Sequence, residues 1–453
     1  MSVERETGVM ADPVHDETVR VGLLGCGHVG SALVRLLQEN AELIEQRAGV
    51  HLEVTRVAVR DPGRERDVPL PANRFTQDGE AVVTDPDIDI VVEVIGGIEP
   101  ARSLITEALK SGKPVVTANK ELLANAGKEL FETAEGSGVD LLFEASVAGG
   151  IPLIRPLRES LAGDRIRRVT GIVNGTTNYI LTRMTEEGSS FDDALAEAQE
   201  LGYAERDPTA DIQGDDAAAK AAIIASIAFG ARVVANDVYR EGIAEITAHD
   251  IASAHDLGYV VKLLAVAEGL EGEVAVRVHP AMIPVHHPLA SVRGSFNALF
   301  IEGDAVGELM LYGRGAGGGP SASAVLGDLI DAAKNFASGG KGATIGALAR
   351  RRIRPMDEIE SQFYLLMEVA DRPGVLAKIA DQFGQHGVSI KSMQQRGIGA
   401  DARLIFATHR AREADLRATV HALRDVDVVH RVGSIVRVLG DEDEWRGGNR
   451  GRA

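Results

Sequence analysis

The chain is short of cysteine, of aromatic residues, of positive charge and of long apolar runs. Cys26 is the only cysteine among 453 residues, which excludes a framework of internal disulfides and is typical of a reducing compartment. The formal net charge is −19 and no basic stripe interleaves with aromatics, which disfavours nucleic acids and anionic membranes as partners. No apolar run approaches the length of a membrane span. These absences predict a soluble, cytoplasmic protein.

The chain is long and rich in apolar residues. Hydrophobic residues make up 45% of it, which is enough for the cores of two or three domains. Residues 1–18 are acidic with mixed charges and lack the basic start and apolar stretch of a secretory signal. We therefore expect residues 1–18 to be a disordered leader and residues 441–453 to be a disordered tail.

A strand, a glycine turn and a helix follow one another at the start of the first predicted domain, residues 19–150. Gly25, Gly27 and Gly30 form a G-x-G-x-x-G pattern between an apolar run and a segment of helical periodicity. Strands and helices then alternate, which predicts an α/β fold with a doubly wound parallel sheet that binds a dinucleotide. The expected strands are 19–25, 52–59, 90–95, 114–117 and 139–144, and the expected helices are 101–111 and 121–135.

The end of the second expected strand predicts which dinucleotide binds. An acidic residue there holds the ribose hydroxyls of NAD, whereas an arginine accommodates the 2′-phosphate of NADP. The chain has Arg60 first, which favours NADP, and Asp61 directly after it, which keeps NAD open. The expected cofactor-binding residues are Gly25, Gly27, His28 (as a loop residue), Val29, Gly30, Arg60, Ile95 and Lys120.

The rhythm of the sequence changes after residue 150. Helices at 192–202 and 215–231 and strands at 274–283 and 296–303 predict an α+β substrate-binding and dimerisation domain over residues 151–318. A helix over 319–340 is expected to return to the nucleotide domain, followed by a linker over 341–360. Residues 361–440 have a βαββαβ order, which predicts a ferredoxin-like module.

The segment from Gly202 to Lys220 combines five acidic residues and a lysine with an apolar helix. Asp216 and Lys220 are spaced i, i+4 and share a helix face, and Glu205 precedes them in a loop. This arrangement suits a site that holds a small polar substrate and moves a proton. A solvated helix start is the alternative, because acidic residues are favoured in a first turn. Capping or turn roles suit Asp207 and Asp211 at least as well as binding.

Several long motifs in correct order over residues 19–350 resemble homoserine dehydrogenase. They are TANK at 117–120, EASVAGGIP at 144–152, GIVNGTTNYIL at 171–181, GYAERDPTAD at 202–211 and GDDAAAK at 214–220. The resemblance implies NAD(P)-dependent interconversion of L-homoserine and L-aspartate 4-semialdehyde, in the branch leading to threonine and methionine.

The resemblance also implies roles for the charged residues. Lys220 would give a proton to the aldehyde oxygen, Glu205 beside Gly202 would bind the substrate, and Asp216 would hold the substrate and orient Lys220. Lys120 would lie between nicotinamide and substrate. We expect the neighbouring carboxylates to raise the pKa of Lys220, so that a cationic Lys220 stabilises the developing alkoxide. Asn174, Thr176 and Thr177 are expected to shape the site rather than react.

Residues 144–151 resemble the monovalent-cation loop of the same family. The resemblance implies that Glu144, with the carbonyls of Val147, Gly149 and Ile151, holds Na⁺, since oxygen ligands suit a hard cation. A glycine-bent hinge between domains is the alternative reading of this segment.

The C-terminal module resembles the ACT domain in its DRPGVL turn at 371–376 and GVSI strand at 387–390. The resemblance implies L-threonine as a feedback inhibitor, and a pure dimerisation element is the alternative. A free sheet edge predicts a homo-oligomer, a dimer or tetramer. The expected effector residues are Asp371, Gly374, Val375, Leu376, Gly387, Ser389 and Ile390.

Two other functions compete with the dehydrogenase. An ACT-bearing 2-hydroxy-acid dehydrogenase would need an Arg and His pair, and no histidine lies in such a motif. A non-catalytic nucleotide-dependent amino-acid sensor would not need Glu205, Asp216 and Lys220 together.

Overall fold

The structure is a computed structural model that describes residues 18–342, 345–397 and 402–440, and these form two units. Unit 1 comprises the described residues up to Asn119, Glu129–Phe143 and the segment from Ser321; unit 2 comprises Lys120–Lys128, Glu144–Pro320 and the segment from Ile345. The expected tail and all but the last residue of the expected leader lie outside the described residues. Among the helices described, none is both long and apolar enough to cross a bilayer.

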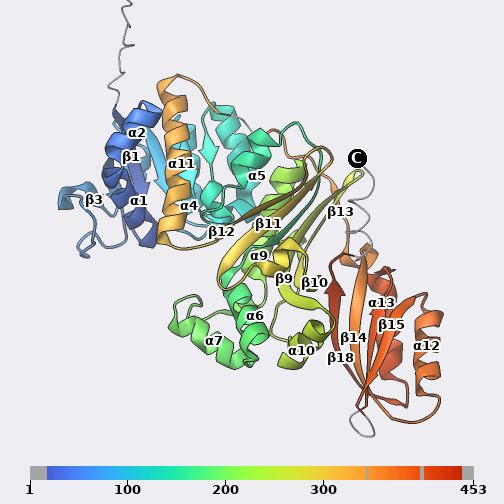
Figure 1. The fold of residues 1–453 in the computed structure, drawn as a ribbon. Coiled ribbons are helices and arrows are strands. Elements are labelled where there is room, and N and C mark those ends of the chain that lie inside the picture. The colour runs from blue at the N-terminus through green and yellow to red at the C-terminus, as the bar shows by residue number, and fades with distance from the viewer. Residues whose placement is uncertain (1–17, 343–344, 398–401, 441–453) are drawn as a thin grey trace, which may run out of the picture. The chain divides into compact units, whose positions relative to one another are not determined.

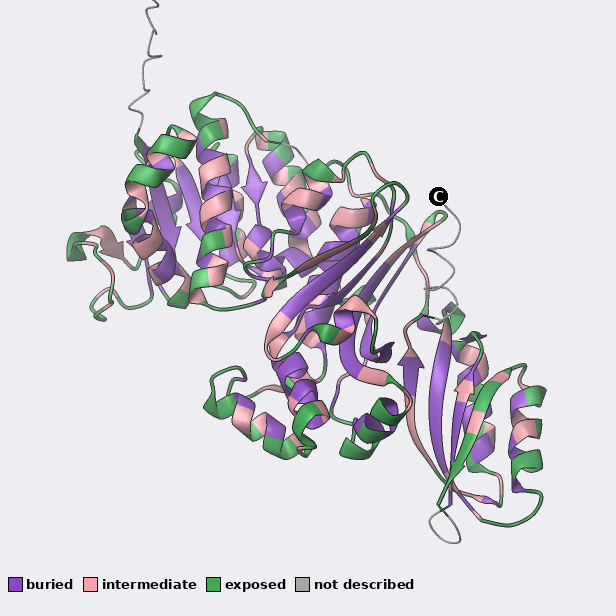
Figure 2. Cartoon of the chain, in the orientation of Figure 1, coloured by how far each residue is buried: buried purple, intermediate pink, exposed green. Residues whose placement is uncertain are grey.

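Unit 1 is built on a six-stranded parallel sheet in the order β3-β2-β1-β4-β5-β6 (Figure 1). The central strands are runs of valine, isoleucine and leucine that are buried on both faces, as parallel strands covered by helices must be (Figure 2). This order matches the doubly wound dinucleotide-binding fold and confirms the predicted fold class. The strands are β1 (Thr18–Leu24), β2 (His51–Ala58), β3 (Phe75–Thr76), β4 (Ile90–Glu93), β5 (Val115–Thr117) and β6 (Leu141–Leu142).

The helices of unit 1 include two short ones that the sequence pattern did not predict, α2 and α3. The strand expected over 139–144 shortens to β6, because Glu144–Ser146 forms a 3-10 turn. Helices α5 and α11 have their first turns in residues of unit 2 and continue in unit 1. The helices are α1 (His28–Glu39), α2 (Ala41–Ala48), α3 (Gly79–Val83), α4 (Ala101–Lys110), α5 (Lys120–Ser137) and α11 (Gly318–Ala337).

Unit 2 contains a mixed sheet whose main path is β12-β11-β7-β9-β10-β18-β14-β16-β15. The strands β7, β9 and β12 were not predicted. The helix α9 packs on β9 and β10, and its alanine-rich surface is buried on most sides. The elements before residue 320 are β7 (Ile166–Ile172), α6 (Gly175–Glu187), α7 (Phe191–Glu200), α8 (Thr209–Ile212), α9 (Asp215–Phe229), β8 (Tyr239–Arg240), α10 (Ala248–Asp256), β9 (Tyr259–Leu270), β10 (Glu273–Pro284), β11 (Phe296–Gly303) and β12 (Gly307–Arg314).

The C-terminal part of unit 2 has the predicted βαββαβ order around its own apolar core. In this core the rings of Phe383 and Phe406 stack with centroids 5.1 Å apart. Its elements are β14 (Glu360–Val369), α12 (Val375–Gln385), β15 (Ile390–Arg396), β16 (Arg403–Thr408), β17 (Ala411–Arg412), α13 (Glu413–Arg424) and β18 (Val429–Val438).

The C-terminal sheet is joined to the preceding sheet of the same chain through β18. The expectation of a free edge is therefore wrong for the β18 side of the C-terminal sheet. β18 pairs in parallel with β10, and β15 ends the described sheet on the other side. The expected linker over 341–360 also contains structure, because the short strand β13 (Arg352–Ile353) pairs with β10. Backbone pairing between segments this far apart in the chain leaves no periodic signal in the sequence.

A buried ion cluster ties three neighbouring strands of this sheet together. The carboxylate of Glu268 on β9 accepts from Arg168 on β7 and from Arg277 on β10, each at 2.7 Å. Burial opposes charge on Glu268, but the two guanidinium groups outweigh burial and lower its pKa to about 2.

We predict that Glu268→Gln lowers the free energy of unfolding by about 3 kcal/mol, because it removes the carboxylate that pairs with the buried Arg277 and with the partly exposed Arg168. The pKa of Glu268 is lower in the folded chain than its ordinary value of 4.5. The ion pairs therefore stabilise fully above pH 4.5, and this stabilisation is lost as the pH falls towards 2. Melting temperatures measured from pH 3 to 8 check both effects. Glu358→Gln, which breaks an exposed pair with Arg352, is the control; an equal melting temperature for both variants would contradict the prediction.

Candidate active site

Two lysines and an aspartate meet at the start of α9. Asp216 Oδ2 accepts from Lys220 Nζ at 2.7 Å, and Asp216 Oδ1 accepts from Lys120 Nζ. The side chains of Asp216 and Lys220 are 8% and 9% exposed, whereas that of Lys120 is 44% exposed. The structure therefore brings the three predicted catalytic residues together, with Lys120 on the solvent side.

Asn174 fixes this cluster from a second element. Its Oδ1 caps α6 by accepting from Thr177 N at 2.8 Å. Its Nδ2 donates to Asp211 Oδ1 at 2.6 Å and to Asp216 Oδ2 at 2.9 Å. Asparagine can do both because its amide carries an acceptor and two donors. Asn174 thus shapes the site, and Asp211 is one of its acceptors rather than a cap.

The charges of the cluster shift one another's pKa values. Burial opposes charge on Asp216, but the two ammonium groups outweigh burial and hold its pKa well below the usual range. Burial would lower the pKa of Lys120, but the Asp216 carboxylate outweighs it and the net shift is upward. For Lys220 burial dominates over the attraction of Asp216 and lowers the pKa. The Asp216 carboxylate does raise the pKa of Lys220, but the expected net upward shift is wrong, because spacing along a helix does not reveal burial.

The contacts of Lys220 define what its amine can do. Lys220 Nζ donates to Asp216 Oδ2 and to the carbonyl oxygen of Val173, each at 2.7 Å. An ammonium has three N–H donors, so the protonated side chain keeps one for another acceptor. A lowered pKa also makes that proton easier to transfer. The geometry suits delivery of one proton to an oxygen atom.

The loop before α8 carries the remaining predicted substrate-binding residues. Glu205 is exposed, and its charge contributes to the raised pKa of Lys120. Gly202 has a φ of 75°, the left-handed conformation that closes α7 and favours glycine. Thr176 Oγ1 donates to Tyr203 O at 2.6 Å and ties this loop to α6. Asp207 accepts hydrogen bonds from Thr209 N and Oγ1. These bonds form a local turn, which is one of the two roles predicted for Asp207.

The glycine loop of unit 1 has the shape that a dinucleotide phosphate needs. Gly25 has a φ of 100°, and a Cβ on Gly30 would lie 2.4 Å from Gly25 O. Both positions therefore require glycine. A Cβ on Gly27, the N-cap of α1, would meet no atom within 4 Å, which leaves space beside the helix N-terminus. His28 and Val29 form the first turn of α1, where backbone amides favour an anion.

Two further predicted cofactor residues, Ile95 and Arg60, lie at the carboxyl ends of strands on either side of β1. Ile95 follows β4 and is 38% exposed, and Arg60 follows β2 and is exposed. Glu93, which the sequence analysis did not single out, shapes the loop at Ile95 by accepting from Ile95 N at 2.8 Å and Thr117 Oγ1 at 2.5 Å. Burial raises the pKa of Glu93.

The predicted cation loop is held by hydrogen bonds between a side chain and the backbone. The Glu144 carboxylate accepts from the backbone amides of Leu153, Ile154 and Arg155 at 2.5–2.8 Å. Gly149 has a φ of 55°, and the buried residues Val147 and Ile151 flank it. No cluster of three or more His, Cys, Asp or Glu side chains suited to a metal occurs in the part of the chain that the structure describes.

The predicted effector residues lie in two segments of the C-terminal domain, one at each end of α12 (Val375–Gln385). Asp371 Oδ1 accepts from Gln395 Nε2 on β15 at 3.3 Å. Gly374 has a φ of 87° and begins α12, in which Val375 is buried and Leu376 is 43% exposed. Gly387, Ser389 and Ile390 lead into β15, the last strand of the described sheet.

Sequence reasoning underrated Asn174 and Asp211 as members of the charged cluster. The Asn-Gly-Thr-Thr run was the available signal, because an asparagine that caps a helix points its amide into the preceding turn. Its acceptors lie 37 and 42 residues further along the chain, beyond the reach of a local pattern.

Comparison with known proteins gives one consistent result. A family model described as homoserine dehydrogenase matches residues 152–330, one described as its NAD binding domain matches 25–144, and one described as ACT domain matches 363–440. The homoserine dehydrogenase of Mycobacterium tuberculosis is 50% identical over 439 residues, which cover 94% of this chain and 99% of that protein.

Solved structures give the same family. The crystal structure of a homoserine dehydrogenase from Thiobacillus denitrificans is 42% identical, has a TM-score of 0.87, and covers 93% of this chain and 98% of its own. A hyperthermophilic archaeal homoserine dehydrogenase in complex with NADPH is 32% identical, has a TM-score of 0.60, and covers 70% of this chain and 98% of its own. The chain therefore belongs to the homoserine dehydrogenase family, the NAD(P)-dependent oxidoreductases that interconvert L-homoserine and L-aspartate 4-semialdehyde.

Proposed function

We propose that Lys220 is the proton donor when the aldehyde is reduced. A nicotinamide cofactor, when bound, would supply a hydride for the carbonyl carbon. The third N–H of the Lys220 ammonium supplies the proton to the carbonyl oxygen. In homoserine oxidation the neutral amine of Lys220 takes the hydroxyl proton. The observation that carries this proposal is the pair of fixed acceptors on Lys220, Asp216 and Val173, which hold its amine in one direction.

We propose supporting roles for the other charged residues. Asp216 holds both lysines, so it orients Lys220 and positions Lys120. Lys120 begins α5, and two residues separate it from the end of β5. Ligands of such folds bind at the carboxyl ends of the parallel strands, so Lys120 would contact both cofactor and substrate. Glu205, beside Gly202, would bind the substrate ammonium group, since its carboxylate is exposed.

The test of this function is turnover of L-homoserine with NADP⁺ or NAD⁺ by the full chain, followed as formation of reduced cofactor. We expect turnover with L-homoserine and none with L-lactate, a 2-hydroxy acid. Turnover of L-lactate at a similar rate would contradict the substrate assignment.

We propose NADP as the preferred cofactor. The exposed Arg60 at the end of β2 supports this choice because a guanidinium pairs with a phosphate in bidentate fashion. The NADPH complex of the archaeal relative is consistent with it.

We predict that Arg60→Ala raises the KM for NADP⁺ at least about tenfold and leaves the KM for NAD⁺ unchanged, because one charge-assisted contact to the 2′-phosphate is lost. Steady-state kinetics with both cofactors measure this effect. Arg47→Ala, which removes an exposed arginine from α2, serves as the control. A preference for NAD⁺ that Arg60→Ala does not change would refute the proposal.

We propose that the loop over 144–151 binds Na⁺ through backbone carbonyl oxygens. Because the Glu144 carboxylate already accepts three amide hydrogen bonds, we assign its contribution to the backbone carbonyl, together with those of Val147, Gly149 and Ile151. Equal activity in sodium-containing and sodium-free choline buffers would contradict this site.

We propose that the C-terminal ACT domain binds L-threonine as a feedback inhibitor at Asp371–Leu376 and Gly387–Ile390. The contact of Asp371 with Gln395 on β15, the strand into which Gly387–Ile390 leads, supports a role for both segments. The open edge of β15 also supports a homo-oligomer, and light scattering that gives a monomer mass would contradict that state.

We predict that Asp371→Ala raises the L-threonine concentration for half-inhibition about tenfold, because the loop loses its hydrogen bond to Gln395 and its charge. Inhibition curves at fixed L-homoserine measure this change. The matched control is Asp381→Ala, which removes an exposed carboxylate from α12 that binds only the neighbouring Gln385 in the contacts described. Identical curves for the two variants would contradict the location of the site.

A further inference from the structure

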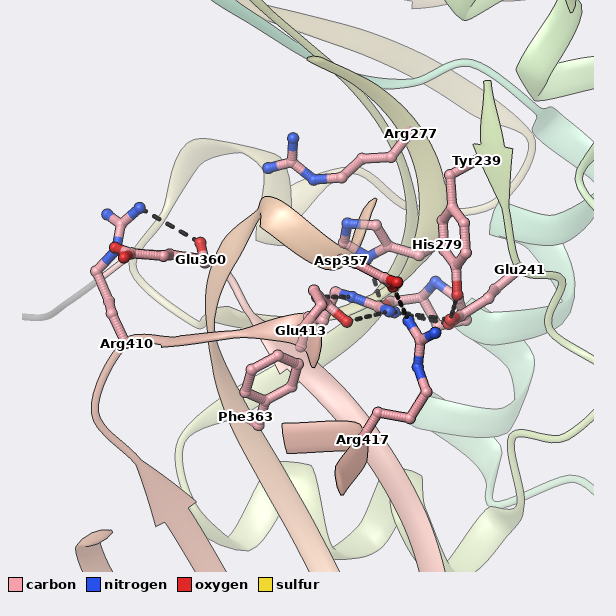
Figure 3. A network of polar contacts seen from close by, with 12 residues as sticks. Tyr239, Glu241, Arg277, His279, Asp357, Glu360, Phe363, Arg410, Glu413 and Arg417 are labelled. Atoms are coloured by element: carbon pink, nitrogen blue, oxygen red, sulfur yellow. Dashed lines mark hydrogen bonds and ion pairs between the residues drawn. The ribbon is translucent and has the colours of Figure 1, made fainter. Parts of the chain in front are cut away.

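A buried arginine joins the C-terminal domain to the segment that precedes β9. Arg437 on β18 is 8% exposed and lies between two carboxylates. It donates to both oxygens of Glu413 at 2.6 and 2.9 Å and to both oxygens of Glu241 at 2.7 and 3.0 Å. Tyr239, from the same segment as Glu241, donates to Glu241, and Figure 3 shows both side chains pointing towards Glu413 of α13.

The Tyr239–Ile243 segment is in turn packed on the start of the catalytic helix. Arg240 pairs with Asp215, the first residue of α9, at 2.6 Å, and Ile243 N donates to Ile212 O at 2.9 Å. A Cβ on Gly242 would lie 2.1 Å from Ile212 O, so the two backbones are in direct contact. A displacement of Glu241 is therefore transmitted to the α8–α9 junction, because close-packed backbone cannot absorb it.

A cavity of about 280 Å³ lies beside this network, between Glu241 and α13. This volume is close to the lower limit of small-molecule sites, about 300 Å³. Leu416, Val420 and Ile435 give the cavity an apolar wall. We call it the junction cavity.

Charged groups of both signs line the junction cavity. Arg417, His421 and Arg424 are exposed along one face of α13 at i, i+4 and i+7, and Arg417 also pairs with Asp357 at 2.6 Å. The carboxylate of Glu241 also lines the cavity; it is 38% exposed and so retains access beyond its contact with Arg437.

We propose that the junction cavity is a second effector site that binds a small α-amino acid. The carboxylate of such a ligand fits the cationic face of α13, its ammonium group fits Glu241, and its side chain fits the apolar wall. A simple anion would offer no positive charge to Glu241, and an apolar molecule would leave the cationic face unused. This site is separate from the Asp371–Ile390 region and rests on the proposed catalytic roles of Asp216 and Lys220.

Binding at the junction cavity acts on catalysis through Glu241. An ammonium group at Glu241 competes with Arg437 for the same carboxylate, which changes the position of the Tyr239–Ile243 segment. The change reaches Asp215 and then Asp216, the next residue, which holds both lysines. We expect kcat/KM for L-homoserine to fall at least about fivefold at saturating ligand, with no change in KM for NADP⁺.

Isothermal titration of the full chain with L-threonine, L-methionine and L-isoleucine tests the site. We expect Arg424→Gln to weaken binding of at least one of them tenfold or more. Arg431→Gln is the matched control, because Arg431 also lies in the C-terminal domain but is 68% exposed and pairs with Glu368 at 4.0 Å, away from the cavity. Glu241→Gln should remove the effect of the bound amino acid on kcat/KM, and melting temperatures establish that each variant is folded.

Three results would overturn the proposal: no heat of binding from any of the three amino acids, equal binding by Arg424→Gln and Arg431→Gln, or loss of binding in Asp371→Ala alone. The last result would place the effector at the Asp371–Ile390 region instead. Homoserine oxidation is measured on the same preparations, so failure of the junction cavity is distinguishable from failure of the catalytic assignment.

Discussion

Replacing Lys220 with alanine is expected to lower kcat for homoserine oxidation about 10³-fold while NADP⁺ still binds. The substitution removes the only amine that both Asp216 and the Val173 carbonyl hold in place among the described contacts. Lys120 cannot replace it, because its own amine is bound to the other oxygen of Asp216 and is more exposed. We expect cofactor contacts from the glycine loop, which belongs to unit 1, whereas Lys220 belongs to unit 2.

Turnover and NADPH fluorescence titration together measure this prediction. Lys334→Ala, which removes an exposed lysine from α11, is the matched control. Near-normal turnover of Lys220→Ala would refute the assignment. If Lys120→Ala abolished turnover and Lys220→Ala did not, Lys120 and not Lys220 would be assigned as the proton donor.

The sequence predicted the contact between Asp216 and Lys220 because that contact is local. Residues four apart on a helix share a face whatever the rest of the chain does. Lys120 lies 96 residues before Asp216, and spacing could not predict that the two would meet. Only the resemblance to a family placed Lys120 in the same site.

The direction of the Lys220 pKa shift shows a second limit of sequence reasoning. Charged neighbours can be counted along the chain, but burial depends on the packing of α9 against β9 and β10. In the structure burial outweighs the carboxylate, so the shift is opposite to the one that neighbour charges predict.

The fold of unit 1 was predictable for a physical reason that does not hold for unit 2. Parallel strands are buried on both faces and form continuous apolar runs between helices, so β1, β4 and β5 stand out. In unit 2 the long strand β9 carries Lys262 and Glu268 within its apolar pattern, and β12 is largely half-exposed, which obscures both. The pairing of β10 with β18 depends on contacts between residues more than 150 positions apart.

Replacing Asp216 with asparagine is expected to be the second most damaging change. Asparagine keeps the size of the side chain but not its charge, so two ammonium groups lose their shared carboxylate. Since Lys220 is buried, we expect a loss of about 3–5 kcal/mol in the free energy of unfolding. We also expect kcat/KM for L-homoserine to fall at least about 10²-fold, because Lys120 loses its carboxylate partner and Lys220 keeps only the Val173 carbonyl as a fixed acceptor.

The pH dependence of this variant separates an electrostatic role from a purely structural one. The Asp216 carboxylate raises the pKa of Lys220 against the larger effect of burial, so its removal lowers that pKa further. Homoserine oxidation requires the neutral amine, and the rising limb of its pH profile must therefore move to lower pH in Asp216→Asn. Asp192→Asn, which removes an exposed charge from the first turn of α7, should leave the profile in place. A shift of the limb to higher pH would contradict the assignment of that limb to Lys220, because losing a neighbouring negative charge cannot stabilise an ammonium group.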